Sequence, residues 1–268
     1  LDPAFIKLNN AQNRSNLYEF DVFERLATSP VIKGMALWGA VSWRFTKKTG
    51  LSGGDLLKVI RENPGYDLYF CNPEPIYEAL YHNLWLQGQT RHPDFLELAG
   101  IFLKAAGLPE SDLESFTASD TFSSSNYFVA TPAFWSRYLP FVRHAIAEVN
   151  KKLPMEVLER LNSSAADDKG LHNGAGYIPF IVERMLPLFL KQQGEGLRTF
   201  KIPLPEREAE LNVHLRLLRE MKDVAVRTRS PWLGACWVNY RNLYLNQTYG
   251  QEWIKSYLKS ITPPTFNF

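Results

Sequence analysis

The chain has 268 residues, of which 45% are apolar and 13% aromatic, and its net charge at pH 7 is +2. This apolar content suffices for a packed core and excludes an intrinsically disordered chain, while the small net charge gives no support for nucleic-acid binding. The two cysteines, Cys71 and Cys236, are too few for a disulfide framework or a zinc site, so we expect a reducing compartment.

The first predicted elements are a strand and a capped helix. Met35–Phe45 is rich in aromatic and β-branched residues and predicts a strand. Ser52 and Asp55 match a capping box, so a helix is expected from there to the stop signal Asn-Pro-Gly at residues 63–65.

A second strand is predicted over Tyr66–Cys71, where polar and apolar residues alternate, and it runs into a polar loop at Asn72 and Glu74. Two helices are expected next, over Ile76–Gln87 and Pro93–Ala106.

The middle of the chain predicts another strand followed by a helix. Asn126–Ala130 reads as a short strand, Thr131 is a good N-cap, and Pro132 suits a first helical position. The helix should continue over Ala133–Val149, with an irregularity at Pro140.

A polar loop at residues 162–176 leads into the most informative segment, Tyr177–Leu190. Its apolar residues recur at helical spacing and predict one helix with a buried stripe. Glu183 lies at the edge of that stripe, where partial desolvation suits a catalytic base. The alternative is that Glu183 and Arg184 form a solvated or salt-bridged helix face.

The C-terminal part is predicted to be helical around Glu206–Val226 and through the aromatic stretch Trp232–Tyr257. Residues 198–268 carry a net charge of +5, from 11 Lys and Arg against 6 Asp and Glu. Strands alternating with helices indicate an α/β domain with a helical C-terminal appendage.

Several common motifs are absent from the sequence, namely the G-x-S-x-G elbow, H-E-x-x-H, C-x-x-C, the P-loop and G-x-G-x-x-G. The histidines lack metal-ligand spacing. Two of them fall within helical segments and are expected to be structural, whereas three lie beside turns or loops and are site candidates: His82, His92 and His172.

Four pieces of the sequence, taken together, resemble a known family. The first is an Asn-rich segment that ends in an acidic residue, Leu8–Glu19, and the second is a strand with Gly before an aromatic residue and Arg, Lys33–Phe45. The third is a strand that begins with Asn and an aromatic residue, Ser125–Tyr138, and the fourth is an apolar helix that contains Glu-Arg, Gly176–Leu190. This order is similar to that of the GT-A-like glycosyltransferases of capsular-polysaccharide and O-antigen synthesis.

The resemblance implies a GT-A-like mixed central sheet flanked by helices over residues 1–205, with residues 206–268 as a helical extension packed on it. It implies transfer of a hexosyl or deoxyhexosyl group from a nucleotide-sugar donor to a glycan or lipid-linked glycan of a bacterial surface polysaccharide, such as capsule, O-antigen or lipopolysaccharide.

The site residues expected on this basis fall into three groups. Glu183 and Arg184 would be catalytic. Donor or nucleotide contacts are expected from Arg44, Asp67, Asn72, Glu74 and His82. Acceptor or cleft contacts are expected from Arg91, His92, Asn126, His172 and Asn173.

The sequence departs from this family in lacking a D-x-D motif, which commonly holds a divalent metal ion. The corresponding strand end offers Asn72-Pro73-Glu74, so any Mn²⁺ or Mg²⁺ would depend on Glu74, and we expect a small metal effect. Arginine side chains could instead neutralise a leaving diphosphate.

Two rival interpretations remain at this point. One is a non-catalytic carbohydrate-binding or scaffold domain of a larger polysaccharide synthase, which the missing D-x-D favours. The other is a domain excised from a multidomain protein, since the chain starts at Leu1.

We expect a cytoplasmic protein, with peripheral contact to the inner face of the membrane through the basic, aromatic C-terminal segment. The alternative is that these aromatic residues pack the appendage onto the body.

Overall fold

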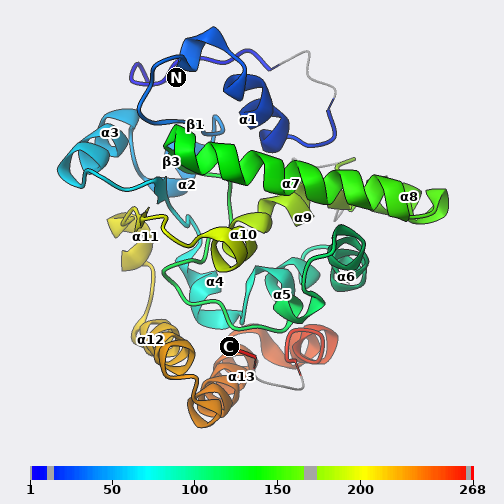
Figure 1. Cartoon of the computed structure of the whole chain (residues 1–268). Coiled ribbons are helices and arrows are strands. Elements are labelled where there is room, and N and C mark those ends of the chain that lie inside the picture. The colour runs from blue at the N-terminus through cyan, green and yellow to red at the C-terminus, as the bar shows by residue number, and fades with distance from the viewer. Residues whose placement is uncertain (1, 11–14, 166–173, 264–266) are drawn as a thin grey trace.

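The computed structural model describes residues 2–10, 15–165, 174–263 and 267–268. The chain has a mixed α/β fold in which helices surround a small four-stranded sheet (Figure 1). The strands are β1 (Trp38–Ala40), β2 (Leu68–Phe70), β3 (Phe128–Ala130) and β4 (Thr199–Lys201), arranged in the order β1-β3-β2-β4. β3 is antiparallel to β1 and β2, and β4 is parallel to β2.

The two faces of the sheet join different cores because side chains alternate along each strand. Leu68, Phe70 and Phe128 belong to the largest core. The helices that share it are α1 (Glu19–Ala27), α6 (Phe95–Ala106), α7 (Pro132–Lys152), α8 (Met155–Asn162), α9 (Tyr177–Glu183) and α10 (Met185–Gln193). Tyr69 and Tyr127 face the other way, into a smaller core with α2 (Phe45–Thr49) and α3 (Gly53–Glu62).

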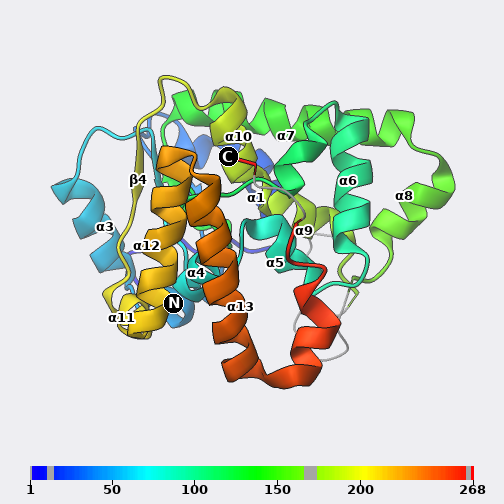
Figure 2. The same ribbon diagram turned by 90° about the horizontal axis from the view of Figure 1, so that it is seen from below.

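A third core joins the C-terminal helices to the body. It lies between α4 (Pro75–Leu80), α5 (Leu84–Gln89), α12 (Val213–Thr228) and α13 (Pro231–Trp253), and α12 and α13 lie side by side (Figure 2). Trp237 is fully buried there, and its indole Nε1 donates to the carbonyl of Ala79 at 3.1 Å. The remaining elements are α11 (Pro205–Ala209), a π-helical segment (Ile254–Leu258) and two 3₁₀ helices (Pro30–Ile32 and Glu110–Leu113).

The predicted helix starts are confirmed by their capping hydrogen bonds. The Ser52 Oγ accepts from the backbone N–H of Asp55 and the Asp55 carboxylate accepts from that of Ser52, which completes the capping box of α3. Thr131 caps α7 by accepting from Phe134 N, and Pro132 is the first residue of the helix. Such caps typically contribute about 1 kcal/mol each. The predicted irregularity at Pro140 does not end α7, which continues to Lys152.

Two predicted elements were too long. The strand expected over Met35–Phe45 ends at Ala40, because Ser42 accepts hydrogen bonds from the backbone N–H groups of Arg44 and Phe45 and turns the chain into α2. The helix expected over Ile76–Gln87 is two helices, since the Asn83 side chain caps α5 by accepting from Leu86 N.

The predicted Tyr177–Leu190 helix is also divided. Its backbone leaves the helical region at Arg184 (φ −94°, ψ 2°), which separates α9 from α10. Residues 206–226 likewise form α11 and α12 with a break at the Asn212 cap, and β4 was not predicted at all. Among the described residues no helix is both long and apolar enough to cross a bilayer.

Candidate functional site

Polar residues lie next to three strands at one end of the sheet, where the strands β1, β2 and β4 finish. We call this end of the sheet the sheet edge. β1, β2 and β4 end at this edge, and β3 begins there because it runs in the opposite direction. Ser42 follows β1, Asn72 follows β2, and Tyr127 immediately precedes β3. Ligands of open α/β sheets bind beyond the carboxyl ends of the parallel strands. This edge is therefore the candidate site.

A pair of hydroxyl groups joins the end of β1 to the start of β3. Ser42 Oγ and Tyr127 Oη lie 2.7 Å apart, within hydrogen-bond distance. The Nζ of Lys48, in α2, lies 5.7 Å from the centre of the Tyr127 ring. Burial raises the pKa of Tyr127 to about 12, although the hydrogen bond with Ser42 opposes the rise. At neutral pH this edge therefore holds a buried, neutral phenol beside a lysine.

Glu183 is the last residue of α9, and its side chain is 28% exposed. Burial raises the pKa of its carboxyl group to about 7, Arg184 and Lys48 oppose the rise, and Glu19 adds to it. Because Glu19 begins α1 and Lys48 lies in α2, three helices bring these charges close enough to interact. A carboxyl group with a pKa near 7 can accept a proton from a substrate hydroxyl under ordinary conditions.

Arg184 has a different environment from its neighbour, since its side chain is only 6% exposed. Its Nε donates to the carbonyl of Leu84 at 2.8 Å, its Nη1 to that of Phe180 at 2.6 Å, and its Nη2 to Gln87 Oε1 at 2.8 Å. The guanidinium therefore joins α9 to α5. We interpret Arg184 as a positioning residue that supports Glu183, rather than as the catalytic residue predicted from the sequence.

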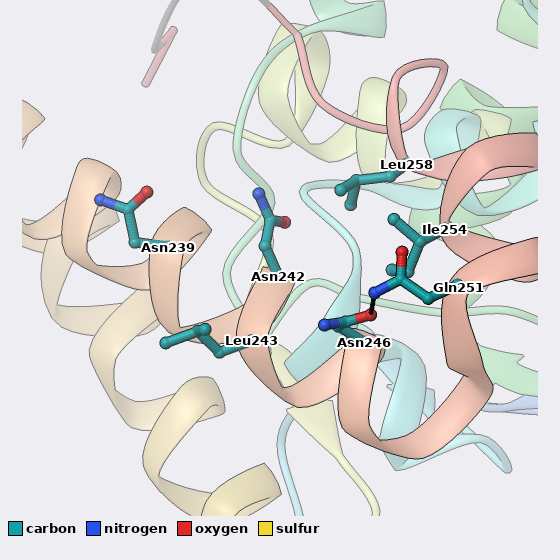
Figure 3. A pocket seen from close by; sticks show the side chains of 7 residues that line it. All are labelled: Asn239, Asn242, Leu243, Asn246, Gln251, Ile254 and Leu258. Atoms are coloured by element: carbon teal, nitrogen blue, oxygen red, sulfur yellow. Dashed lines mark hydrogen bonds between the residues drawn. The ribbon is translucent and has the colours of Figure 1, made fainter.

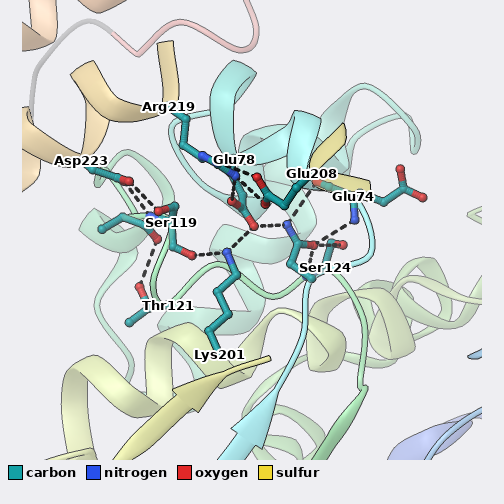
Figure 4. A network of polar contacts seen from close by, with 11 residues as sticks. Glu74, Glu78, Ser119, Thr121, Ser124, Lys201, Glu208, Arg219 and Asp223 are labelled. Atoms are coloured by element: carbon teal, nitrogen blue, oxygen red, sulfur yellow. Dashed lines mark hydrogen bonds and ion pairs between the residues drawn. The ribbon is translucent and has the colours of Figure 1, made fainter. Parts of the chain in front are cut away.

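Behind the end of β2 lies a buried network of charged groups (Figure 4). The Glu78 carboxylate is 1% exposed and accepts from Asn72 Nδ2 at 2.6 Å and from Lys201 Nζ at 2.5 Å. Arg219 lies 3.4 Å from Glu78 and donates to both carboxylate oxygens of Glu208 at 2.7 Å. The network ties β2, α4 and β4 to α11 and α12.

The same network engages both ends of the Asn72 amide. Its Oδ1 accepts from Ser124 Oγ at 2.5 Å, and its Nδ2 donates to Glu78. Lys201 also donates to the carbonyl of Ser119, whose hydroxyl donates to Asp223 at 2.5 Å. Asn72 thus fixes the loop before β3, and its amide is already committed to protein groups.

Three predicted residues do lie at this edge with functional groups available. Glu74 is half-buried, and burial raises the pKa of its carboxyl group while Lys48 and Arg207 oppose the rise. Within the described part of the chain, its carboxylate makes no hydrogen bond or ion pair, and the amide of Asn126 has no hydrogen-bond partner. Arg44 precedes α2, and its charge acts on Tyr127.

Two residues predicted to contact the nucleotide lie away from the edge. Asp67 is at the opposite end of β2, where its carboxylate accepts from Thr131 Oγ1 at 3.3 Å and from Arg198 N at 3.0 Å. His82 is fully buried, with its Nδ1 3.3 Å from Arg241 Nη1. Burial lowers the pKa of His82 well below its ordinary value, so the ring is neutral. Both residues serve packing and strand pairing here.

Two of the predicted acceptor residues, Arg91 and His92, contact other protein groups. Arg91 is exposed and donates to Tyr77 Oη at 3.1 Å. His92 stacks on Phe180, with ring centres 4.0 Å apart, and its Nδ1 lies 2.8 Å from the carbonyl of Ala165. Two further predicted residues fall outside the described part of the chain: His172 and Asn173.

The predicted metal ligand finds little support from its neighbours. In the ranges that the structure describes, no group of three or more His, Cys, Asp and Glu side chains is placed to hold a metal ion. Glu74 supplies one carboxylate, while the Asn72 oxygen is occupied by Ser124. These residues fit Mn²⁺ or Mg²⁺ poorly, because such ions prefer several oxygen ligands.

Sequence reasoning missed Ser42, Lys48 and Tyr127 as members of the site. Ser42 and Tyr127 are adjacent or nearly adjacent to Arg44 and Asn126, which were predicted, but the antiparallel pairing of β1 with β3 is what brings them together. A tyrosine next to a predicted strand-start asparagine was the available signal.

Two of the surface hollows that the described residues form lie elsewhere, and neither is lined by Glu183. One, of about 540 Å³, is mainly apolar and lies between α1 and α7, where Met35, Trp38 and Trp135 line it. The other, of about 440 Å³, lies along α13. Comparison with family models, curated proteins and solved structures found no match to this chain.

Proposed function

We propose that the chain is a glycosyltransferase that moves a sugar from a nucleotide-sugar donor to a glycan acceptor at the β1-β3-β2-β4 sheet edge, within a GT-A-like α/β fold. The observation that carries the proposal is the Glu183 carboxyl group, whose pKa burial raises to about 7 at the break between α9 and α10. A general base is useful when its pKa lies near the working pH.

In this proposal Glu183 acts in an inverting displacement. Its carboxylate removes the proton from an acceptor hydroxyl as that oxygen forms a bond to the anomeric carbon of the donor. The bond from that carbon to the diphosphate breaks, and the electron pair leaves on the nucleoside diphosphate. The proton remains on Glu183 until solvent removes it, so charge and atoms balance without a further reactant.

Cations at the same edge support a reaction in which a nucleoside diphosphate is the leaving group. Lys48 interacts electrostatically with both Glu183 and Glu74, and Arg44 lies at the start of the same helix. A guanidinium fork and an ammonium group both suit phosphate oxygens. We assign the diphosphate to Lys48 and Arg44, and no step requires a metal ion.

The proposed acceptor is a glycan or lipid-linked glycan of a bacterial surface polysaccharide, reached from the cytoplasmic side of the membrane. The helices α12 and α13 offer a surface for contact with the membrane. Trp232 is 82% exposed at the start of α13, close in sequence to the exposed Arg227 and Arg229. Aromatic and basic side chains suit an anionic membrane interface. Among the other aromatic residues of this segment, Trp237 is fully buried, whereas Tyr249 is 45% exposed.

The experiment is a melting-temperature screen with nucleoside diphosphates and nucleotide sugars, with and without Mg²⁺ or Mn²⁺. Binding of one nucleotide raises the melting temperature, because a ligand that binds only the folded state stabilises it. The matched variant is Arg44→Gln, which should weaken that shift, whereas Arg61→Gln, an exposed residue of α3, should not. Failure of every nucleotide to shift the melting temperature at millimolar concentration contradicts the proposal.

A second candidate function is a glycan-binding domain without transfer activity. Trp43 favours it, since this side chain is 76% exposed beside Ser42 and Arg44 at the sheet edge. An exposed indole offers a flat surface for the apolar face of a sugar ring. In that case glycans but no nucleotide would bind, and the same melting screen distinguishes the two functions.

A further inference from the structure

The hollow along α13 has an unusual chemical lining (Figure 3). Four of its side chains are carboxamides: Asn239, Asn242, Asn246 and Gln251. The others are aliphatic: Leu243, Ile254 and Leu258. None of the described residues that line it is charged, and its volume of about 440 Å³ lies within the usual range for small-molecule sites.

A glycine bend creates this hollow. Gly250 has φ +80° and ψ 172°, a conformation that L side chains rarely adopt, so the chain leaves the axis of α13 there. The bend carries Gln251, Ile254 and Leu258 round to face the end of α13 (Figure 3). The two walls of the hollow therefore come from one helix and the segment that follows it.

Internal hydrogen bonds orient the amides within the walls. Asn242 Oδ1 accepts from the Nε and Nη2 of Arg241 at 3.1 and 2.9 Å, and because a guanidinium only donates, this leaves Asn242 Nδ2 as a donor. Gln251 Nε2 donates to Asn246 Oδ1 at 2.8 Å, which leaves Asn246 Nδ2 as a donor and Gln251 Oε1 as an acceptor. Asn239 is exposed and makes no side-chain hydrogen bond to a described residue.

We propose that this hollow is a second ligand site, specific for neutral oligosaccharides. Pre-oriented amide donors and acceptors match neighbouring sugar hydroxyls, which also donate and accept. The aliphatic floor suits the C–H face of a sugar ring, and the uncharged lining gives no anchor for phosphate or carboxylate ligands. The site lies outside the sheet edge and does not depend on the transferase activity.

The test is a titration of the full chain with neutral trisaccharides of glucose and of N-acetylglucosamine, followed by the side-chain amide signals in nitrogen-15 NMR spectra. The signals of Asn239, Asn242 and Asn246 should move together. Asn239→Leu and Asn246→Leu should each weaken binding about three- to tenfold, the usual worth of one hydrogen bond. Gln247→Leu is the matched control, because this exposed residue of the same helix does not line the hollow.

The inference is overturned if no neutral trisaccharide moves these signals at millimolar concentration, if Gln247→Leu weakens binding as much as the other variants, or if a uronic-acid trisaccharide binds better than the neutral ones. Nucleotide-induced melting shifts are measured on the same variants. Asn239→Leu should retain any such shift, so a failure of this site is distinguishable from a failure of the proposed function.

Discussion

Glu183 and Arg184 are consecutive residues with opposite environments: the carboxylate is 28% exposed, whereas the guanidinium 3.8 Å away is 6% exposed and donates to three groups on α9 and α5. Glu183 is the last residue of α9, and Arg184 is the break between α9 and α10. One residue can therefore meet a substrate while the other holds the backbone in place.

Glu183→Gln should lower sugar transfer by about 10²–10⁴, the usual contribution of a general base, because glutamine keeps the shape but accepts no proton. Transfer is measured as release of nucleoside diphosphate in the presence of acceptor. Donor binding should persist. Glu159→Gln, at an exposed position of α8, is the control, and a Glu183→Gln variant with normal transfer would remove Glu183 from the mechanism.

The stability of the protein should fall as pH rises from about 4.5 to 7 in a way that Glu183→Gln abolishes. The ordinary pKa is 4.5 and the folded value about 7, so the folded state favours the protonated carboxyl group and loses that stabilisation as it ionises. This rise corresponds to up to about 3 kcal/mol. Urea unfolding at pH 4.5 and pH 8 measures it: the Gln variant should gain stability relative to wild type only at the higher pH, and an equal difference at both would be contrary.

Arg184→Lys should destabilise the protein by about 3 kcal/mol, because a lysine cannot reproduce three diverging hydrogen bonds to buried acceptors. Arg160→Lys provides the comparison, since Arg160 is a surface residue paired with Glu97 at 2.9 Å and should cost less than about 1 kcal/mol. Chemical unfolding gives both values. A stable but inactive Arg184→Lys protein would restore the catalytic role predicted from the sequence.

Lys201→Met should cost about 3–5 kcal/mol by leaving the buried Glu78 carboxylate without its closest cation. Lys58→Met, which removes an exposed pair with Glu62, should change stability by no more than about 0.5 kcal/mol. Both are read from urea unfolding. Similar small effects for the two variants would mean that Asn72 and Arg219 suffice for Glu78.

Trp232→Ser should reduce binding to liposomes that contain anionic lipid, and added salt should weaken the binding of wild type. Co-sedimentation measures both effects. Trp43→Ser removes a tryptophan at the sheet edge that is 76% exposed, and it should leave binding unchanged. Absence of wild-type binding at every salt concentration would assign the C-terminal aromatic residues to packing alone.

The sequence predicted those parts of the fold that depend only on residues close together in the chain. Ser52 and Asp55 marked the start of α3, and Thr131 and Pro132 marked the start of α7. Each N-cap side chain accepts a hydrogen bond from the backbone N–H three positions further along the chain. β4 escaped prediction because three half-buried residues have no periodicity of their own and become a strand only by pairing with β2. The break at Arg184 likewise depends on distant acceptors on α5.

The site residues, too, could be predicted only where neighbouring residues in the sequence reveal them. Glu183 could be singled out because its position on an apolar stripe is visible in the sequence. Ser42 and Tyr127 are 85 positions apart, and only the antiparallel pairing of β1 and β3 puts their hydroxyls in contact. His82 looked available beside a turn, yet α13 covers it through Arg241.

The parallel pairing of β4 with β2 has a consequence for how the chain acquires its structure. Where these strands begin, the backbone N–H of Arg198 donates to the carboxylate of Asp67, 131 positions earlier in the chain. During synthesis, therefore, β2 is made long before the segment that pairs with it as β4. Such distant contacts form slowly, and an unpaired strand edge invites association between chains. A nascent chain that stops short of residue 199 therefore leaves one side of β2 unpaired, although β3 can already pair with the other side.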